Sequence, residues 1–247
     1  MNLVRPAFSL LCLAVVACSP CTEQPEMEVA GSFPELRGPY LGQEPPGLEP
    51  QLFAPGIVST GLATRDVAMM PDGSDIYIAV TAGADTLIKV TKEEDGVWTE
   101  PVVAPFSGRY LDIEPAISPD GMKFFFLSTR PQPGQEENPG WVYQDIWVMD
   151  REGDGWGEPY NLGAPINSDA PVYFPSVTND GTLYFTREGE GRQSATYRSR
   201  VVDGAYTEPE KLGPEVNCGT NRFNVYVAPD ESFAIVPAVG REDSLGG

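Results

Sequence analysis

Histidine is absent from the 247 residues of this chain, and with it the side chain most often used at catalytic and metal sites. Neutral imidazole is the commonest ligand of zinc and iron and the usual general base near neutral pH. A Ser-His-Asp triad therefore cannot be built within the chain. We expect no metal and no other cofactor, and binding is favoured over catalysis.

Basic residues are also scarce. Lys and Arg number 16 against 36 Asp and Glu, which gives a formal net charge of −20. Binding to nucleic-acid phosphates requires clustered Lys and Arg, so no nucleic-acid partner is expected. Such an excess of negative charge is typical of proteins that stay soluble through mutual repulsion.

No apolar run in the sequence reaches the length of about 20 residues that a helix needs to span a bilayer. The apolar stretch from Phe8 to Val16 is shorter than this and follows the single positive charge of Arg5. A basic residue followed by a short apolar stretch is typical of a signal peptide that is removed on export. We predict that residues 1–17 are this signal peptide.

The end of this stretch, Val15-Val16-Ala17-Cys18, resembles the bacterial lipobox. The resemblance implies that Cys18 is acylated, becomes the new N-terminus and anchors the chain in a lipid bilayer of the cell envelope. Ser19 stands where an aspartate would resemble an inner-membrane retention signal, so an outer-membrane location is expected. The alternative is an ordinary signal peptide, with Cys18 in a disulfide.

Cysteines are few, and only Cys21 and Cys218 remain once Cys12 is removed with the signal peptide and Cys18 is acylated. An oxidising compartment would permit a bridge between these two residues, and two thiols are equally compatible with the sequence.

Residues 18–50 have the composition of a tether. Seven prolines occur between positions 19 and 50, and acidic residues recur there without an apolar period. Such a segment buries too little surface to offset the entropy of ordering it, so we expect it to be extended or mobile. Residues 41–55 are expected to be only partly free, because Leu52-Phe53-Ala54 could begin a strand. The folded part is predicted to cover residues 51–247.

No segment has sustained helical periodicity, and two landmarks repeat about every 50 residues. The first is a tight turn: Pro71-Asp72-Gly73, Pro119-Asp120-Gly121, Asn179-Asp180-Gly181 and Pro229-Asp230-Glu231. The second is an aromatic residue shortly before Glu-Pro: Trp98-Thr99-Glu100-Pro101, Trp156-Gly157-Glu158-Pro159 and Tyr206-Thr207-Glu208-Pro209. The second unit carries an insertion that we place at residues 131–143. The chain is therefore predicted to be a tandem repeat.

Each unit is predicted to contain four antiparallel strands. A short strand precedes each turn, a nearly continuous apolar strand follows it, and such runs are typical of strands buried on both faces. The apolar strands are expected at Asp75–Val80, Lys123–Leu127, Leu183–Thr186 and Phe233–Val236. Third strands are expected at Leu87–Thr91, Asp145–Met149 and Ala195–Arg200, and the strand with the aromatic residue comes last. Four-stranded units repeated radially make a β-propeller.

The segment from Ile117 to Arg130, followed by Asp145-Ile146-Trp147-Val148-Met149, resembles the TolB-type WD-like β-propeller repeat. The resemblance covers roughly residues 52–247 and implies an all-β propeller of four-stranded antiparallel blades. It says little of function, because the repeat occurs in binding proteins, assembly factors and accessory domains of peptidases. Two positions depart from it: Glu231 replaces the turn glycine, and the first unit lacks the Ser-x-Arg ending.

Residues 240–247 resemble a loop that leads into a third strand. Because a propeller closes by pairing its last blade with its first, we expect the sequence to be the N-terminal part of a longer propeller with five or six blades. A four-bladed ring completed by a strand from residues 52–58 remains open.

Three arginines, Arg130, Arg187 and Arg241, are expected in the loop that follows the apolar strand of their units. In a blade, that loop shares a face with the link to the next blade and with the insertion, which carries Trp141 and Tyr143. This face could bind carboxylates, sugars or acidic peptide. Alternatively, each arginine pairs with an acid of a neighbouring blade, and the two aromatic residues cap their blade.

The favoured function is therefore a non-catalytic propeller of the cell envelope that binds a protein, peptide or glycan. A propeller enzyme acting on glycans would need converging carboxylates, and no pair stands out in so acidic a chain. The propeller half of a serine peptidase would need a further Gly-x-Ser-x-Gly elbow and a histidine. A calcium loop at residues 150–155 is less favoured than a plain hairpin, because Asn161 stands where a bidentate Glu belongs.

Overall fold

The computed structural model describes residues 33–168, 170–189, 193–222 and 224–242. The chain divides into two units, residues 1–34 and 35–247, and every strand of the described residues lies in the second unit. The expected signal peptide, Cys18 and Cys21 lie outside the described residues. In the part that is described, no helix is long and apolar enough to cross a membrane.

The strands fall into four successive groups, which we call blades 1 to 4. Blade 1 contains β1 (Ala63–Met69), β2 (Asp75–Ala82), β3 (Asp85–Glu94), β4 (Val97–Trp98) and β5 (Val102–Val103). Blade 2 contains β6 (Asp112–Ile117), β7 (Lys123–Ser128), β8 (Asp145–Glu152), β9 (Gly155–Trp156) and β10 (Tyr160–Asn161). Blade 3 contains β11 (Val172–Val177), β12 (Leu183–Glu188), β13 (Ser194–Ser199), β14 (Val201–Val202), β15 (Ala205–Tyr206) and β16 (Glu210–Lys211). Blade 4 contains β17 (Asn221–Arg222), β18 (Tyr226–Val227), β19 (Ala234–Ile235) and β20 (Ala238–Val239).

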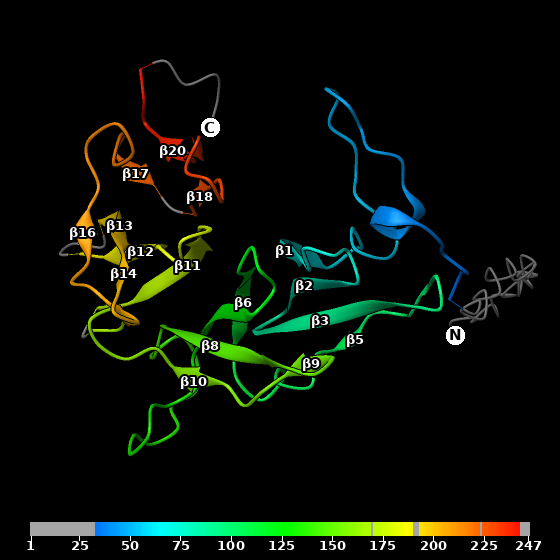
Figure 1. Cartoon of the computed structure of the whole chain (residues 1–247), viewed down its shortest axis with the longest axis horizontal. Coiled ribbons are helices and arrows are strands. Elements are labelled where there is room, and N and C mark those ends of the chain that lie inside the picture. The colour runs from blue at the N-terminus through cyan, green and yellow to red at the C-terminus, as the bar shows by residue number, and fades with distance from the viewer. Residues whose placement is uncertain (1–32, 169, 190–192, 223, 243–247) are drawn as a thin grey trace, which may run out of the picture. The chain divides into compact units, whose positions relative to one another are not determined.

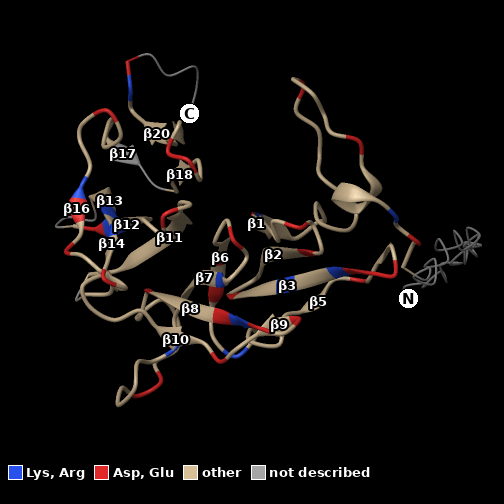
Figure 2. Cartoon of the chain, viewed as in Figure 1, with Lys and Arg blue, Asp and Glu red and all other residues tan. Residues whose placement is uncertain are grey.

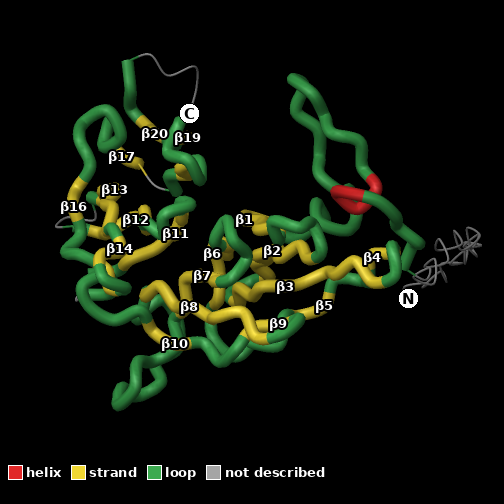
Figure 3. The backbone as a smooth tube through the Cα atoms, viewed as in Figure 1, coloured by secondary structure: helices red, strands yellow, loops and turns green. Residues whose placement is uncertain are grey.

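Each of the first three blades has an antiparallel sheet of four strands in chain order from the inner strand outwards, β1-β2-β3-β5, β6-β7-β8-β10 and β11-β12-β13-β16. The short strands β4 and β9 also pair with β3 and β8, and β14 and β15 pair with each other. In Figure 1 the inner strands β1, β6 and β11 lie toward the middle of the array, with β5, β10 and β16 farther out. Blade 4 has two antiparallel pairs among the described residues, β17 with β20 and β18 with β19. Figure 3 shows that the described part of the chain consists almost entirely of strands and loops. The fold is the predicted all-β propeller, with a fourth blade that is incomplete in the described residues.

The second strand of each complete blade is buried on both faces, as its apolar sequence predicts. Residues 76–80 of β2 are all buried, and so are Phe124 to Leu127 of β7. Tyr77, Phe124 and Trp147 share one core between blades 1 and 2, whereas Phe125, Ile146 and Phe185 share another between blades 2 and 3. Alternate side chains of one strand therefore pack against different neighbours, and this holds the blades together.

The Asp-Gly turns form as predicted, including the one without glycine. In all four turns the aspartate accepts the amide of the residue two positions later, at 3.0 to 3.1 Å. Gly73, Gly121 and Gly181 have φ between 72° and 82°, and Glu231 has φ 58° at the same place. The aspartate bond therefore sets the turn, and glycine only lowers its strain.

The links between blades share one polar device. Ser107, Asn167 and Asn217 accept the amides of Ile88, Ile146 and Thr196 at 3.0, 3.0 and 2.7 Å. Each link thus closes back on the third strand of the blade it leaves. Without these bonds, the three amides would lack a partner at the point where the outer strand stops pairing with the third strand. Buried amides need such a partner.

Part of the predicted tether packs on blade 1 instead of extending freely. Leu41 is buried, and it shares a core with Val58 and Trp98. The indole of Trp98 donates to the carbonyl of Gly38 at 2.8 Å, and the backbone amide of Trp98 donates to Leu36 at 2.9 Å. A few apolar residues are therefore enough to hold residues 36–41 and 53–58 against blade 1, while residues 44–52 between them are exposed.

Candidate functional site

The insertion at residues 131–143 lies beside two cavities. One, of about 380 Å³, is bounded by the start of β3 at residues 85–87, by the link at residues 108–111 and by residues 137–140. The other, of about 590 Å³, lies between residues 132–145 and the link at residues 163–171. The insertion therefore lies beside the links that leave blades 1 and 2. Tyr143 lines the second cavity, and its hydroxyl donates to the backbone carbonyl of Glu136 at 3.1 Å. Trp141 is 44% exposed.

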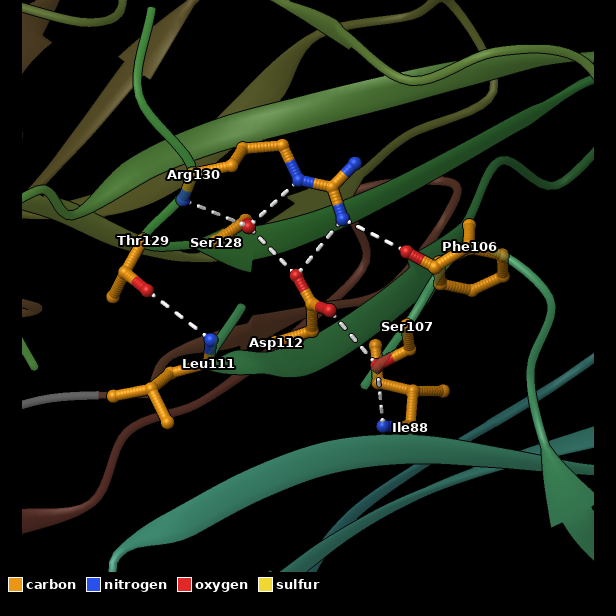
Figure 4. A network of polar contacts seen from close by, with 8 residues as sticks. All are labelled: Ile88, Phe106, Ser107, Leu111, Asp112, Ser128, Thr129 and Arg130. Carbon is orange, nitrogen blue, oxygen red and sulfur yellow. Dashed lines mark hydrogen bonds and ion pairs between the residues drawn. The ribbon is translucent and has the colours of Figure 1, made fainter. Parts of the chain in front are cut away.

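Arg130 is not on the surface. It is 8% exposed, and its Nη2 donates to Asp112 Oδ1 at 3.1 Å and to the carbonyl of Phe106 at 2.9 Å. Ser128 Oγ accepts from Arg130 Nε at 2.9 Å and donates to the same carboxylate oxygen at 2.6 Å. Figure 4 shows Ser107 closing the network on the other oxygen of Asp112. Arg130 thus pairs with an acid of its own blade and ties that blade to the preceding link.

The three predicted arginines do not occupy equivalent positions. Arg187 lies inside β12, where it pairs with Val172. The equivalent residue of blade 2 is Ser128, which pairs with Asp112. Arg130 comes two residues after Ser128. Arg187 Nη2 donates to the carbonyls of Pro165 and Ile166, both at 3.0 Å. Arg241 is exposed and follows β20. The expected common loop position is therefore wrong for Arg187.

A second place in the fold was not singled out from the sequence. Each complete inner strand contains a β-bulge, with two residues opposite one: at Arg65-Asp66 in β1, Glu114-Pro115 in β6 and Phe174-Pro175 in β11. In blade 4, Asn224 takes the corresponding position ahead of β18. These bulges line a cavity of about 520 Å³ between the inner strands, which we call the central cavity.

The side chains at the bulges meet across blades. Arg65 Nη2 donates to Glu114 Oε1 and, at 3.3 Å, to Asn224 Oδ1. The other oxygen of Glu114 accepts the backbone amide of Phe174 at 2.7 Å. Arg65 Nε lies 3.5 Å from Asp66 Oδ2. One guanidinium therefore links blades 1, 2 and 4, and one carboxylate links blades 2 and 3.

Burial sets the charges of this cluster. The side chain of Glu114 is 3% exposed, and desolvation raises its pKa to about 7 despite the nearby Arg65. Desolvation also raises the pKa of Asp66, against the lowering effects of Arg65 and of the Glu114 amide. The Arg65 side chain stays 44% exposed. The cavity thus presents a half-exposed cation above two buried carboxyl groups.

The bulges repeat while their side chains do not. Glu114, Phe174 and Asn224 have φ of 59°, 54° and 58°, a conformation that costs such residues about 1 to 3 kcal/mol each. Arg65 has the same register place in blade 1 without a positive φ, so the four bulges carry Arg, Glu, Phe and Asn. Structural roles in a repeat recur from unit to unit, whereas unlike side chains at one register place indicate function. Aligning the units on their turns would have shown these unlike residues within otherwise apolar strands.

Acidic residues dominate the charges elsewhere in the described part of the chain. Figure 2 shows Asp and Glu along the strands and turns of the blades, with Lys and Arg far fewer. Among the described residues, no three acidic or cysteine side chains come together in a way that could hold a metal ion. Cys218 is half-buried in the loop before β17, and Cys21 lies outside the described residues.

Comparison with known proteins gives structural neighbours only. No protein-family model and no curated protein matches the chain. TolB from Acinetobacter baumannii is 16% identical with a TM-score of 0.48, over 75% of this chain and 40% of that one. A Mycobacterium tuberculosis puromycin-hydrolyzing peptidase is 19% identical with a TM-score of 0.40, over 65% and 24% of the two chains. A Hadza microbial sialidase is 15% identical with a TM-score of 0.44, over 65% and 38%. This chain therefore spans less than half the length of each of these proteins.

Proposed function

We propose that this chain is an exported lipoprotein, anchored in the cell envelope through acylated Cys18, whose propeller binds a segment of an envelope protein without catalysis. Binding takes place in the central cavity. The observation that carries the proposal is the set of unlike side chains at the repeated bulges, with Arg65 half-exposed among them. A segment of polypeptide offers carbonyls to this guanidinium and apolar groups to the proline and tyrosine side chains of the cavity.

In vivo photo-cross-linking tests this assignment. A photoreactive phenylalanine analogue in place of Val67, which is 43% exposed and lines the central cavity, is expected to trap the partner in living cells. Adding Arg65→Ala removes charged hydrogen bonds and should lower the adduct roughly tenfold, the loss typical of such bonds. The measurement is the yield of the adduct on a denaturing gel.

Two controls make this result specific. The same analogue at Val202, which is 53% exposed on β14 of blade 3, should give no adduct of the same size. Tyr226→Ala removes an exposed ring of the cavity without opening a buried charge, so it should weaken the adduct in a folded chain. Equal adducts from both sites, or adducts that ignore Arg65 and Tyr226, would contradict the proposal.

The anchor has its own prediction. Cys18→Ala should abolish incorporation of radiolabelled palmitate and move the chain out of the membrane fraction, because the acyl chains supply most of the membrane affinity. Cys21→Ala is the matched control and should keep both label and membrane association. Label that persists in Cys18→Ala would refute the lipobox assignment and favour an ordinary signal peptide.

A second candidate is glycan hydrolysis at the same cavity. It is favoured by one observation: Glu114 is a buried carboxyl group whose pKa of about 7 suits a general acid near neutral pH. Turnover of aryl glycosides that Glu114→Gln abolishes would replace binding with catalysis. Cross-linking that requires Arg65, without turnover, would keep the binding assignment.

A further inference from the structure

A different cavity lies between blades 1 and 2, and its shape departs from the repeat. It measures about 460 Å³ and is lined by Tyr77 and Val90 of blade 1, by the link at residues 105–110 and by residues 155–159 of blade 2. Its volume falls in the range of small-molecule sites. We call it the inter-blade cavity, and it is separate from the central cavity.

A short link accompanies this cavity. In the link out of blade 1, Ala104 and Ser107 bond to the carbonyl and the amide of Ile88, and they stand three positions apart. In the link out of blade 2, Leu162 and Asn167 bond in the same way to Ile146, and they stand five positions apart. The longer link places Ile166 in the core between blades 2 and 3, where it is fully buried. Phe106 of the shorter link is only half-buried, and the cavity opens beside it.

The inner wall of the cavity is aromatic. The Phe124 ring, fully buried in the same core, has its centroid 4.7 Å from that of Tyr77, 5.1 Å from that of Phe106 and 5.3 Å from that of Trp156. The Trp156 indole donates to the hydroxyl of Tyr77 at 2.7 Å, which fixes both rings. Rings held in this way offer edges and faces to a flat apolar group with little loss of side-chain entropy.

The charged groups of the lining are mostly positive, unlike the chain as a whole. Lys92, Arg109 and Arg130 line the cavity, and Glu158 is the only acid among its lining residues. The whole chain has a net charge of −20, so this balance is a local reversal. Lys92 pairs with Asp75 at 3.4 Å, and the 72% exposed Arg109 pairs with Glu137 at the rim. Each cation thus has one acidic partner outside the lining, and within the lining itself positive groups outnumber negative ones by three to one.

Arg130 supplies a built donor at this place. Its guanidinium lies over the rings of Tyr110, Phe126 and Trp147 at 5.0 to 5.3 Å and is held by Asp112 and Ser128. Nη1 makes no hydrogen bond to a described residue, and in Figure 4 it points away from Asp112 and Ser128. A guanidinium that is fixed through its other two nitrogens and keeps Nη1 unpaired is a strong site for a carboxylate oxygen.

From this geometry we infer that the inter-blade cavity binds a small aromatic carboxylic acid. The ring of the ligand lies against Phe106 and Trp156, and its carboxylate accepts from Arg130 Nη1 and from Arg109 at the rim. The inference does not depend on the central cavity, because the two cavities share no lining residue. Either can therefore fail without the other.

Titration calorimetry with 3-phenylpropionate, its uncharged amide and propionate tests the inference on the full chain with Cys18→Ser, which stays unacylated. The acid is expected to bind at least about tenfold more tightly than the amide or propionate, because only the acid has both the ring and the charge. Raising the salt concentration should weaken the binding of the acid, because salt partly screens its attraction to the cations of the cavity.

Variants locate the binding. Arg109→Glu is expected to weaken the acid about tenfold or more, since it replaces an exposed cation at the rim. Arg200→Glu is the matched control, because Arg200 is also exposed and also pairs with a single exposed acid, Glu210. Arg130→Lys keeps the charge but loses the fork, so it should weaken the acid; because it also loses contacts to Ser128 and Phe106, its affinity is measured below its own thermal transition.

Three results would overturn the inference: no saturable heat with 3-phenylpropionate at millimolar concentration, equal affinity for acid and amide, or equal effects of Arg109→Glu and Arg200→Glu. Binding that survives Arg109→Glu but responds to Arg65→Ala would place the ligand in the central cavity, and the inter-blade assignment would be wrong.

Discussion

Asp112→Asn should lower the free energy of unfolding by about 3 to 5 kcal/mol, the cost of leaving a buried charge without its partner. Asp112 has no exposed surface and accepts from Ser107, Ser128 and Arg130. Burial raises the pKa of Asp112, with Arg130 and the two hydroxyls opposing that rise. Without the carboxylate, Arg130 stays charged, because guanidinium does not lose its proton in proteins.

Urea unfolding followed by tryptophan fluorescence at constant pH measures this loss. The exposed pair of Arg109 and Glu137 is the control, and Glu137→Gln should change stability by less than about 1 kcal/mol. The double variant Asp112→Asn/Arg130→Met should cost less than the sum of its two single changes, because it removes both charges. Additive effects, or a loss below about 1 kcal/mol for Asp112→Asn, would show that the network is not a buried ion pair.

The same network explains why the fold could be predicted and the role of Arg130 could not. Turn aspartates and apolar strands are local signals, so the apolar and third strands of blades 1 to 3 follow from the sequence within about three residues. Whether an arginine faces a cavity or an acid depends on residues far apart in the chain. Asp112 and Phe106 stand 18 and 24 positions from Arg130, and nothing in the local pattern marks them as its partners.

Spacing from the turn explains the error at Arg187. Arg130 follows Gly121 by nine residues, whereas Arg187 follows Gly181 by only six. Register reduces this offset to two residues, because Ala116 pairs with Phe125, four residues after Gly121, and Ser176 pairs with Tyr184, three residues after Gly181. Arg187 therefore still lies inside the strand, at the place of Ser128, and a shared position after the apolar run does not make two arginines equivalent.

The central cavity was missed for a related reason. Glu114 lies in the short strand that precedes the second turn, and in a regular strand its side chain would simply alternate with its neighbours. The bulge breaks that alternation and turns the side chain toward Arg65 and the amide of Phe174. A bulge depends on the register of two strands, and a single strand's composition does not reveal it.

Glu114 gives the chain a stability that falls as pH rises. Its pKa is about 7 in the folded chain against 4.5 for an unperturbed glutamate, so the folded state holds this proton more tightly than the unfolded state. The contribution is full below about pH 4.5 and is lost as pH rises through 7. A difference of this size corresponds to about 3 kcal/mol.

Glu114→Gln mimics the protonated side chain and cannot titrate. The two pKa values set the range to be measured, from pH 5 to pH 8. Across it, the wild type should lose about 3 kcal/mol of unfolding free energy relative to this variant. Urea unfolding across that range measures the difference. Glu208→Gln, at an exposed residue of blade 3, should run parallel to the wild type. Asp66, whose pKa is also raised, titrates in both proteins, so it largely cancels in the comparison. Parallel curves for Glu114→Gln and the wild type would mean that Glu114 is ionised at neutral pH, and the candidate general acid of the central cavity would be lost with it.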